Sequence, residues 1–249
     1  MHHRLHGPGR SYPYAWRLPD LARPLGRAAV DRACHALALD LYTLGRFQEA
    51  LAALPQPHAA EAECLGQRLA LLLEHRPPVG ETRHRTLDVE EACYLGYLEN
   101  RPLDWPAQQA VGTTAPEQAW RALLLAWHRA RSDRAVDRET LLASSHQALA
   151  TLRAGHPALA AQGEAVLAET HYWLGPRWAT VWLDQALDQA DLYGQHHLKA
   201  RLMGLKARAL EAAGELGEGA RFRKQARALA ERQGARLYLR LFIDEAEPG

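Results

Sequence analysis

The chain has 249 residues, 47% of them hydrophobic and 24% charged, with a formal net charge of +1 at pH 7. No apolar run approaches the roughly 18 residues needed to span a bilayer, and the first 26 residues lack the unbroken apolar centre of a signal peptide. These features exclude a membrane-spanning protein and predict a cytoplasmic one. Ala, Leu, Glu, Arg and Gln dominate and β-branched runs are missing, which predicts helix almost throughout.

Prolines recur in the first 26 residues, at Pro8, Pro13, Pro19 and Pro24. A proline inside a helix removes a backbone hydrogen bond and clashes with the preceding turn. We therefore predict a flexible N-terminal arm over residues 1–26, followed by one elongated helical domain over residues 27–249.

The helical domain is predicted to begin with a hairpin: a helix over residues 27–44, a turn at Gly45 and a short helix over residues 46–54. This hairpin resembles a tetratricopeptide (TPR) unit. That family places a small residue midway down the first helix, glycine at the turn, an aromatic residue two positions later and alanine three after that. The matching residues are Ala38, Gly45, Phe47 and Ala50.

The resemblance implies an all-α, right-handed α-α superhelix, or solenoid, of stacked helix hairpins. Further helices are predicted over residues 58–75 and 88–100. Core positions that we interpret as equivalent recur at intervals of 30, 29 and 27 residues, which indicates short or missing second helices in the N-terminal half. These positions are Cys34, Cys64, Cys93 and Trp120.

The pattern becomes more regular from residue 114 to residue 234, starting with Thr114 and Glu117, which form a capping box at a helix start. A capping helix is predicted over residues 235–245, with a short strand as the alternative because leucines alternate there. The helix that opens at Thr114 is predicted to carry Trp120, Leu123, Leu124 and Trp127 on one face. Between it and the capping helix, helices are predicted over residues 137–154, 157–174, 176–193, 196–213 and 218–233.

An internal repeat supports this part of the prediction. The block from Ala186 to Ala190, which ends at Gly194, is echoed forty residues later by the block from Ala226 to Ala230, which ends at Gly234. A period in this range is typical of two-helix units, since one such unit cannot bury its own apolar face and needs a neighbour.

No convincing catalytic pattern occurs in the sequence: it lacks a glycine-rich phosphate loop, a His-Glu-x-x-His zinc helix and a Gly-x-Ser-x-Gly elbow. Asp184, Asp188 and Asp191 share a helix face and could ligate a divalent cation, but nothing near them supplies more oxygen ligands, so we interpret them as a solvated face. We predict a protein without catalytic residues, metal site or cofactor.

The TPR resemblance also implies where a partner would bind, because the first helices of such hairpins line a concave groove. The positions carried over are rich in arginine, whose planar fork suits carboxylates or phosphates. Alternatively, these side chains are only solvated or ion-paired between helices. The predicted partner-binding residues are Arg32, His35, Arg121, His128, Arg129, His171, Arg201 and Arg208. Glu164 is also expected to face the groove.

The seven tryptophans allow two interpretations. Trp120 with Trp127, and Trp178 with Trp182, share helix faces. Large aromatic side chains mostly fill the core between helices, and the alternative is a lined pocket for a peptide or a small ligand.

These observations predict a non-enzymatic adaptor or regulatory protein that binds a protein segment, with acidic groups, in its groove. One alternative is a sensor that closes over a peptide or small molecule, like the helical arrays of some bacterial transcription regulators. Another is nucleic-acid binding, because residues 199–240 hold eleven basic and four acidic residues. The sequence does not indicate the oligomeric state.

Overall fold

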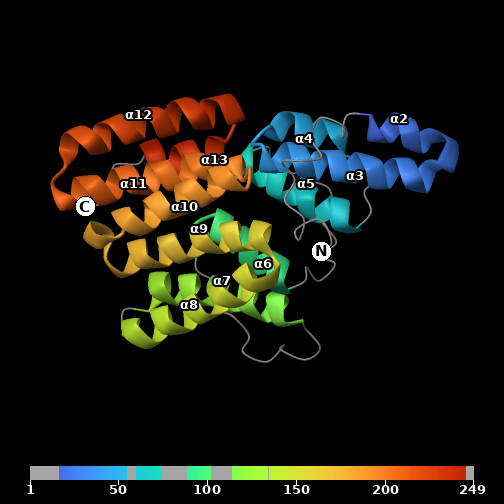
Figure 1. Cartoon of the computed structure of the whole chain (residues 1–249). Coiled ribbons are helices and arrows are strands. Elements are labelled where there is room, and N and C mark those ends of the chain that lie inside the picture. Colours follow the sequence, from blue (N-terminus) through green and yellow to red (C-terminus); the bar gives the residue numbers. More distant parts are fainter. Residues whose placement is uncertain (1–16, 55–59, 75–88, 102–113, 134, 245–249) are drawn as a thin grey trace.

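The computed structural model describes residues 17–54, 60–74, 89–101, 114–133 and 135–244, and every element in these ranges is a helix (Figure 1). No strand occurs among the described residues, which confirms the predicted all-α class. None of the described helices is long and apolar enough to cross a membrane.

The N-terminal part differs from the prediction. Residues 1–16 of the predicted arm lie outside the described residues. Residues 18–25 of that arm are helical and form α2 (Leu18–Ala22) and the 3-10 helix η3 (Arg23–Leu25). Pro19 and Pro24 each lie in the first turn of their helix, where the missing N–H has no intrahelical partner to lose.

The first predicted hairpin is present as α3 (Arg27–Thr43) and α4 (Phe47–Ala53). Gly45 lies in the turn at a φ of +75°, a conformation that glycine adopts without steric cost. Ala38, Phe47 and Ala50, which carry the resemblance to a TPR unit, have no accessible surface.

The remaining helices follow the predicted order. α5 (Ala60–Leu72) and α6 (Val89–Leu98) run singly, and three hairpins come after them. Short 3-10 turns, η4 (Pro176–Trp178) and η5 (His196–Leu198), precede α10 and α11. The hairpin helices are α7 (Ala115–Ser132), α8 (Arg138–Gly155), α9 (Pro157–Leu174), α10 (Thr180–Leu192), α11 (Lys199–Ala213) and α12 (Leu216–Gln233).

Side-chain caps explain two of the helix starts. The predicted capping box at α7 is confirmed, and the Thr114 N–H donates to Glu117 Oε2 at 2.8 Å. At α8 the Asp137 carboxylate accepts hydrogen bonds from the N–H groups of Glu139 and Thr140. Each cap satisfies backbone donors that have no partner inside the helix.

The forty-residue repeat corresponds to the ends of α10 and α12. Gly194 has a φ of +66° and Gly234 a φ of +70°. After each glycine the next N–H donates back into the helix, from Gln195 to the Ala190 carbonyl at 2.7 Å and from Ala235 to the Ala230 carbonyl at 2.9 Å. Both copies of the repeat therefore end the second helix of a hairpin in the same way.

The C-terminal segment is helical. α13 (Arg236–Tyr238) continues directly into the π-helix η6 (Leu239–Asp244), so the alternative of a short strand is wrong. Leu237, Tyr238, Phe242 and Ile243 are buried, because this segment packs against α5, α11 and α12.

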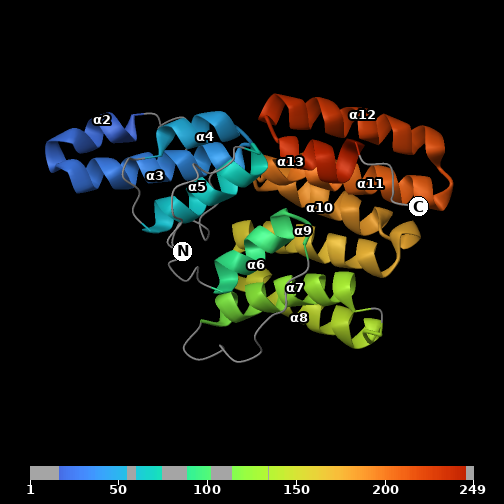
Figure 2. The ribbon, with the colours of Figure 1, turned by 180° about the vertical axis from the view of Figure 1, so that it is seen from behind.

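Sequential hairpins pack against one another, but the two ends of the chain also meet. Figures 1 and 2 show α3, α4 and α5 beside α12 and α13. Arg240 Nε donates to Glu74 Oε1 at 2.7 Å, and Gly45 lies against the Gln233 side chain. An array growing along one axis would keep its first and last hairpins apart, so this contact was not expected from the repeat.

Candidate functional site

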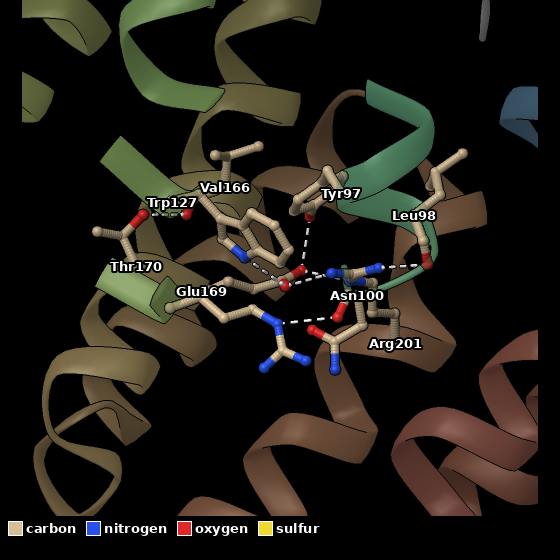
Figure 3. Close-up of polar contacts among 9 residues, drawn as sticks. Tyr97, Leu98, Asn100, Trp127, Val166, Glu169, Thr170 and Arg201 are labelled. Carbon is tan, nitrogen blue, oxygen red and sulfur yellow. Dashed lines mark hydrogen bonds and ion pairs between the residues drawn. The ribbon is translucent and has the colours of Figure 1, made fainter. Parts of the chain in front are cut away.

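A cluster of buried polar contacts lies where α6 meets α7, α9 and α11 (Figure 3). At its centre Arg201 of α11 donates two hydrogen bonds to the Glu169 carboxylate of α9. Nε lies 2.7 Å from Oε1, and Nη2 lies 2.6 Å from Oε2. Neither side chain has any accessible surface. Since burying two ions is costly, such a pair persists only when other groups satisfy both partners.

The neighbouring residues supply those groups. The Tyr97 hydroxyl donates to Glu169 Oε1 at 2.5 Å, and Trp127 Nε1 donates to Oε2 at 3.3 Å. Arg201 Nη1 donates to the Leu98 carbonyl at 3.0 Å, and the guanidinium lies 4.1 Å from the Tyr97 ring centre and 4.4 Å from that of Phe242. The carboxylate and the guanidinium are thus held by hydrogen bonds and aromatic faces together.

The electrostatics of the cluster keep Arg201 and Tyr97 each in one protonation state. Burial acts to lower the pKa of Arg201, but the Glu169 carboxylate more than offsets it and the pKa is raised. Burial and the same carboxylate raise the pKa of the Tyr97 hydroxyl well above its usual value. Arg201 therefore stays charged and Tyr97 stays protonated near neutrality, which suits a fixed support for α6 rather than proton transfer.

The cluster changes the interpretation of two predicted partner-binding residues. Arg201 and His128 were expected to face a groove, yet both are buried, and His128 Nε2 lies 3.3 Å from the Cys93 carbonyl of α6. α6 covers this part of α7, α9 and α11. A side chain beneath it has no surface to offer a partner in this conformation.

The other predicted residues are dispersed. Glu164 is buried and pairs with Arg153, and His171 stacks on Trp182 with ring centres 4.1 Å apart. Arg32 and Arg129 are exposed and lie on different helices, α3 and α7. His35, Arg121 and Arg208 are half-buried.

The tryptophans divide between the two interpretations. Trp120 and Trp127 have no accessible surface and belong to the core formed by α6, α7, α8 and α9. Trp178 is 82% exposed, and Trp182 is half-buried against His171. The core interpretation therefore holds for Trp120 and Trp127 and not for Trp178.

Two of the three acidic residues on this face of α10, Asp184 and Asp191, form ion pairs. Lys206 binds Asp184, and Lys199 binds Asp191 with Nζ 2.6 Å from Oδ1. Among the described residues no group of three or more His, Cys, Asp and Glu side chains could hold a metal ion.

A basic cleft lies between the α3–α4 turn and the α11–α12 hairpin. Its volume is about 590 Å³, and none of the described residues that line it is acidic. Gly45 lines the cleft from the α3–α4 turn, and Gln233 lines it from the end of α12. Its apolar lining comes from Leu44, Met203, Ala228 and Leu229, and its basic lining from Arg46, His196, Lys199 and Arg232.

The basic residues of this cleft differ in how they are neutralised. Arg46 pairs with Glu49, and Lys199 pairs with Asp191, but both carboxylates are about half exposed. Arg232 is exposed and forms no ion pair with a described residue. Because exposed ion pairs contribute little, an incoming carboxylate could exchange with them.

Comparison with protein-family models, curated proteins and solved structures finds no match. Arg46, Lys199 and Arg232 were not among the residues predicted to bind a partner, nor were Tyr97 and Glu169 of the buried cluster. No spacing relates residue 46 to residue 232, so the excess of basic residues after Lys199 is the only signal that could have indicated the cleft.

Proposed function

We propose that this protein is an adaptor built of TPR-like helix hairpins, and that it binds an acidic segment of another protein in the cleft between the α3–α4 turn and α11–α12. The observation that supports this best is the lining of the cleft, which combines basic and apolar residues and contains no described acidic residue. A segment with several carboxylates and one apolar side chain complements both kinds of lining.

The position of the cleft favours a protein partner that contacts both the N-terminal and the C-terminal hairpin. Arg46 comes from the N-terminal hairpin, and Lys199 and Arg232 come from the C-terminal one. A segment bound across them would stabilise the contact between the two ends, because it would bind only the conformation in which they meet.

The proposal can be tested with a fluorescent hexapeptide, Glu-Asp-Glu-Leu-Asp-Glu, by fluorescence anisotropy. We expect binding that weakens as salt rises from 0.1 M to 1 M, over which the Debye length falls from about 10 Å to about 3 Å. The triple variant Arg46→Gln, Lys199→Gln and Arg232→Gln should bind at least about tenfold more weakly, a loss of about 1.4 kcal/mol.

A matched control is the triple variant Arg32→Gln, Arg129→Gln and Arg177→Gln, which removes the same charge from exposed positions outside the cleft. It should bind the peptide as the wild type does. Equal losses in the two triple variants would show that only net charge matters and would contradict the cleft as the site.

The apolar part of the cleft gives a second test. Replacing leucine by serine in the peptide should weaken binding, since Met203 and Leu229 would no longer cover an apolar side chain. If a single-stranded oligonucleotide bound the cleft more tightly than the peptide and lost affinity in the cleft variant, the nucleic-acid alternative would replace this proposal.

A further inference from the structure

Arg131, in the last turn of α7, lies beside the buried pair of Arg201 and Glu169 and forms no ion pair with a described carboxylate. Its Nε donates to the Asn100 carbonyl at 2.8 Å, and its guanidinium lies 4.5 Å from the Trp173 ring centre. These two contacts fix the plane of the guanidinium. Its terminal Nη1 and Nη2 form no hydrogen bond or ion pair with a described residue.

The charge balance around Arg131 is incomplete. Burial lowers the pKa of Arg131, and repulsion from Arg201 lowers it further, while Glu169 acts in the opposite direction. Two arginines thus share one carboxylate, which already makes two hydrogen bonds to Arg201. A half-buried guanidinium in this position would gain from one more negative charge.

Two neighbouring side chains also have hydrogen-bonding capacity that no described residue uses. Asn100 Oδ1 and Trp173 Nε1 are both buried without a partner in the described part of the chain. Asn100 adopts a φ of +55°, a conformation that is uncommon outside glycine. An unsatisfied buried polar atom destabilises the folded protein, so a ligand that satisfied these two atoms would recover part of that energy.

We propose that Arg131, Asn100 and Trp173 form a binding site for a carboxylate that has an amide N–H beside it. The two Nη groups of Arg131 and the Trp173 N–H are donors for the carboxylate, and Asn100 Oδ1 is an acceptor for the amide. A planar fork with two free donors matches a carboxylate. The excess of one positive charge also favours a monovalent anion over a dianionic phosphate.

This chemistry occurs in a small N-acyl amino acid and at the carboxyl end of a peptide. The site lies at the end of α7, at the end of α9 and just after α6, and none of its three residues lines the basic cleft. The inference therefore does not depend on the proposed function, and the two can fail separately.

The test uses the full chain and thermal unfolding in the presence of N-acetylglycine, with N-acetylglycinamide as the uncharged control. We expect the unfolding temperature to rise with the concentration of the acid and to stay constant with the amide. Isothermal titration calorimetry should give an affinity for the acid that falls at least about tenfold in Arg131→Gln. Arg129→Gln, an exposed change two residues earlier on the same helix, should bind as the wild type does.

Two further variants keep the test informative if Arg131→Gln does not fold. Arg131→Lys retains the charge but loses the fork, and should also bind the acid more weakly. Asn100→Gly should fold, because glycine adopts the positive φ at this position without strain. Its affinity for N-acetylglycine should fall toward its affinity for acetate, because the amide N–H of the ligand loses its acceptor. Equal binding of acid and amide, or undiminished binding in both Arg131→Lys and Asn100→Gly, would overturn the proposal.

The source of the carboxylate is distinguished by a third ligand, N-acetyl-trialanine with a free carboxyl end. Tighter binding of this peptide than of N-acetylglycine would assign the site to a peptide terminus. Tighter binding of N-acetylglycine would assign it to a small acid. Both outcomes support the site, and binding of neither ligand would refute it.

Discussion

Glu169 and Arg201 form a two-point ion pair in which neither side chain has any accessible surface. The pair joins α9 to α11, and Arg201 Nη1 extends the connection to the Leu98 carbonyl at the end of α6. These contacts therefore connect three helices from different parts of the chain.

The losses of stability from removing each partner of this pair should not add. Arg201→Met leaves the Glu169 carboxylate buried without its countercharge, and we expect a loss of about 3–5 kcal/mol in the free energy of unfolding. The double variant with Glu169→Gln should lose clearly less than the sum of the two single losses. Urea unfolding of the two single variants and the double variant measures this, and additive losses would contradict the coupling.

The tryptophans offer a direct comparison of core and surface. Trp120 has no accessible surface, so Trp120→Ala should cost about 3–5 kcal/mol, as truncation of large buried aromatic residues does. Trp178 is 82% exposed, and Trp178→Ala should change stability by less than about 0.5 kcal/mol. Chemical denaturation of both variants is the measurement, and similar losses would show that the assigned burial is wrong.

Two glycines with positive φ test the contact between the chain ends. Gly45→Ala and Gly214→Ala should both incur about 1–2 kcal/mol of backbone strain. Only at Gly45 would the new methyl group overlap another side chain, that of Gln233, whereas nothing lies within 4 Å of the Cβ position at Gly214. Gly45→Ala should thus have the lower unfolding temperature. Equal temperatures would contradict the packing of Gly45 against α12.

Two histidines with lowered pKa values should make the protein less stable in acid. Burial lowers the pKa of His197 to about 3, and burial with repulsion from His146 lowers that of His171 to about 4. Because the unfolded chain takes up these protons near pH 6.5, the stability that the two histidines contribute should be fully present above that pH and fall as pH decreases toward 4.

The slope that His197 contributes should reach up to about 1.4 kcal/mol per pH unit, and that of half-buried His171 should be smaller. His197→Gln should flatten the dependence of the unfolding free energy on pH between 6.5 and 4. An unchanged slope in this variant would contradict the burial of His197.

Local patterns in the sequence determined the helices and their ends. The prediction for residues 157–174 coincides with α9, and the capping box at Thr114 forms as expected. The glycines at 45, 194 and 234 all adopt the positive φ that ends or turns a helix. These features depend on residues within a turn or two of each other, so the sequence alone is sufficient to predict them.

Tertiary packing alone decided which helix faces remained accessible. Arg201 and Arg208 share a face by their seven-residue spacing, yet Arg201 is fully buried and Arg208 only half-buried. The difference arises because Arg201 meets Glu169 and the Leu98 carbonyl, groups 32 and 103 residues away in the chain. Arg46 and Arg232, which are far apart in the sequence, likewise line the same cleft. Helix periodicity shows that a residue belongs to a face, but whether that face is covered depends on distant helices whose positions no local pattern encodes.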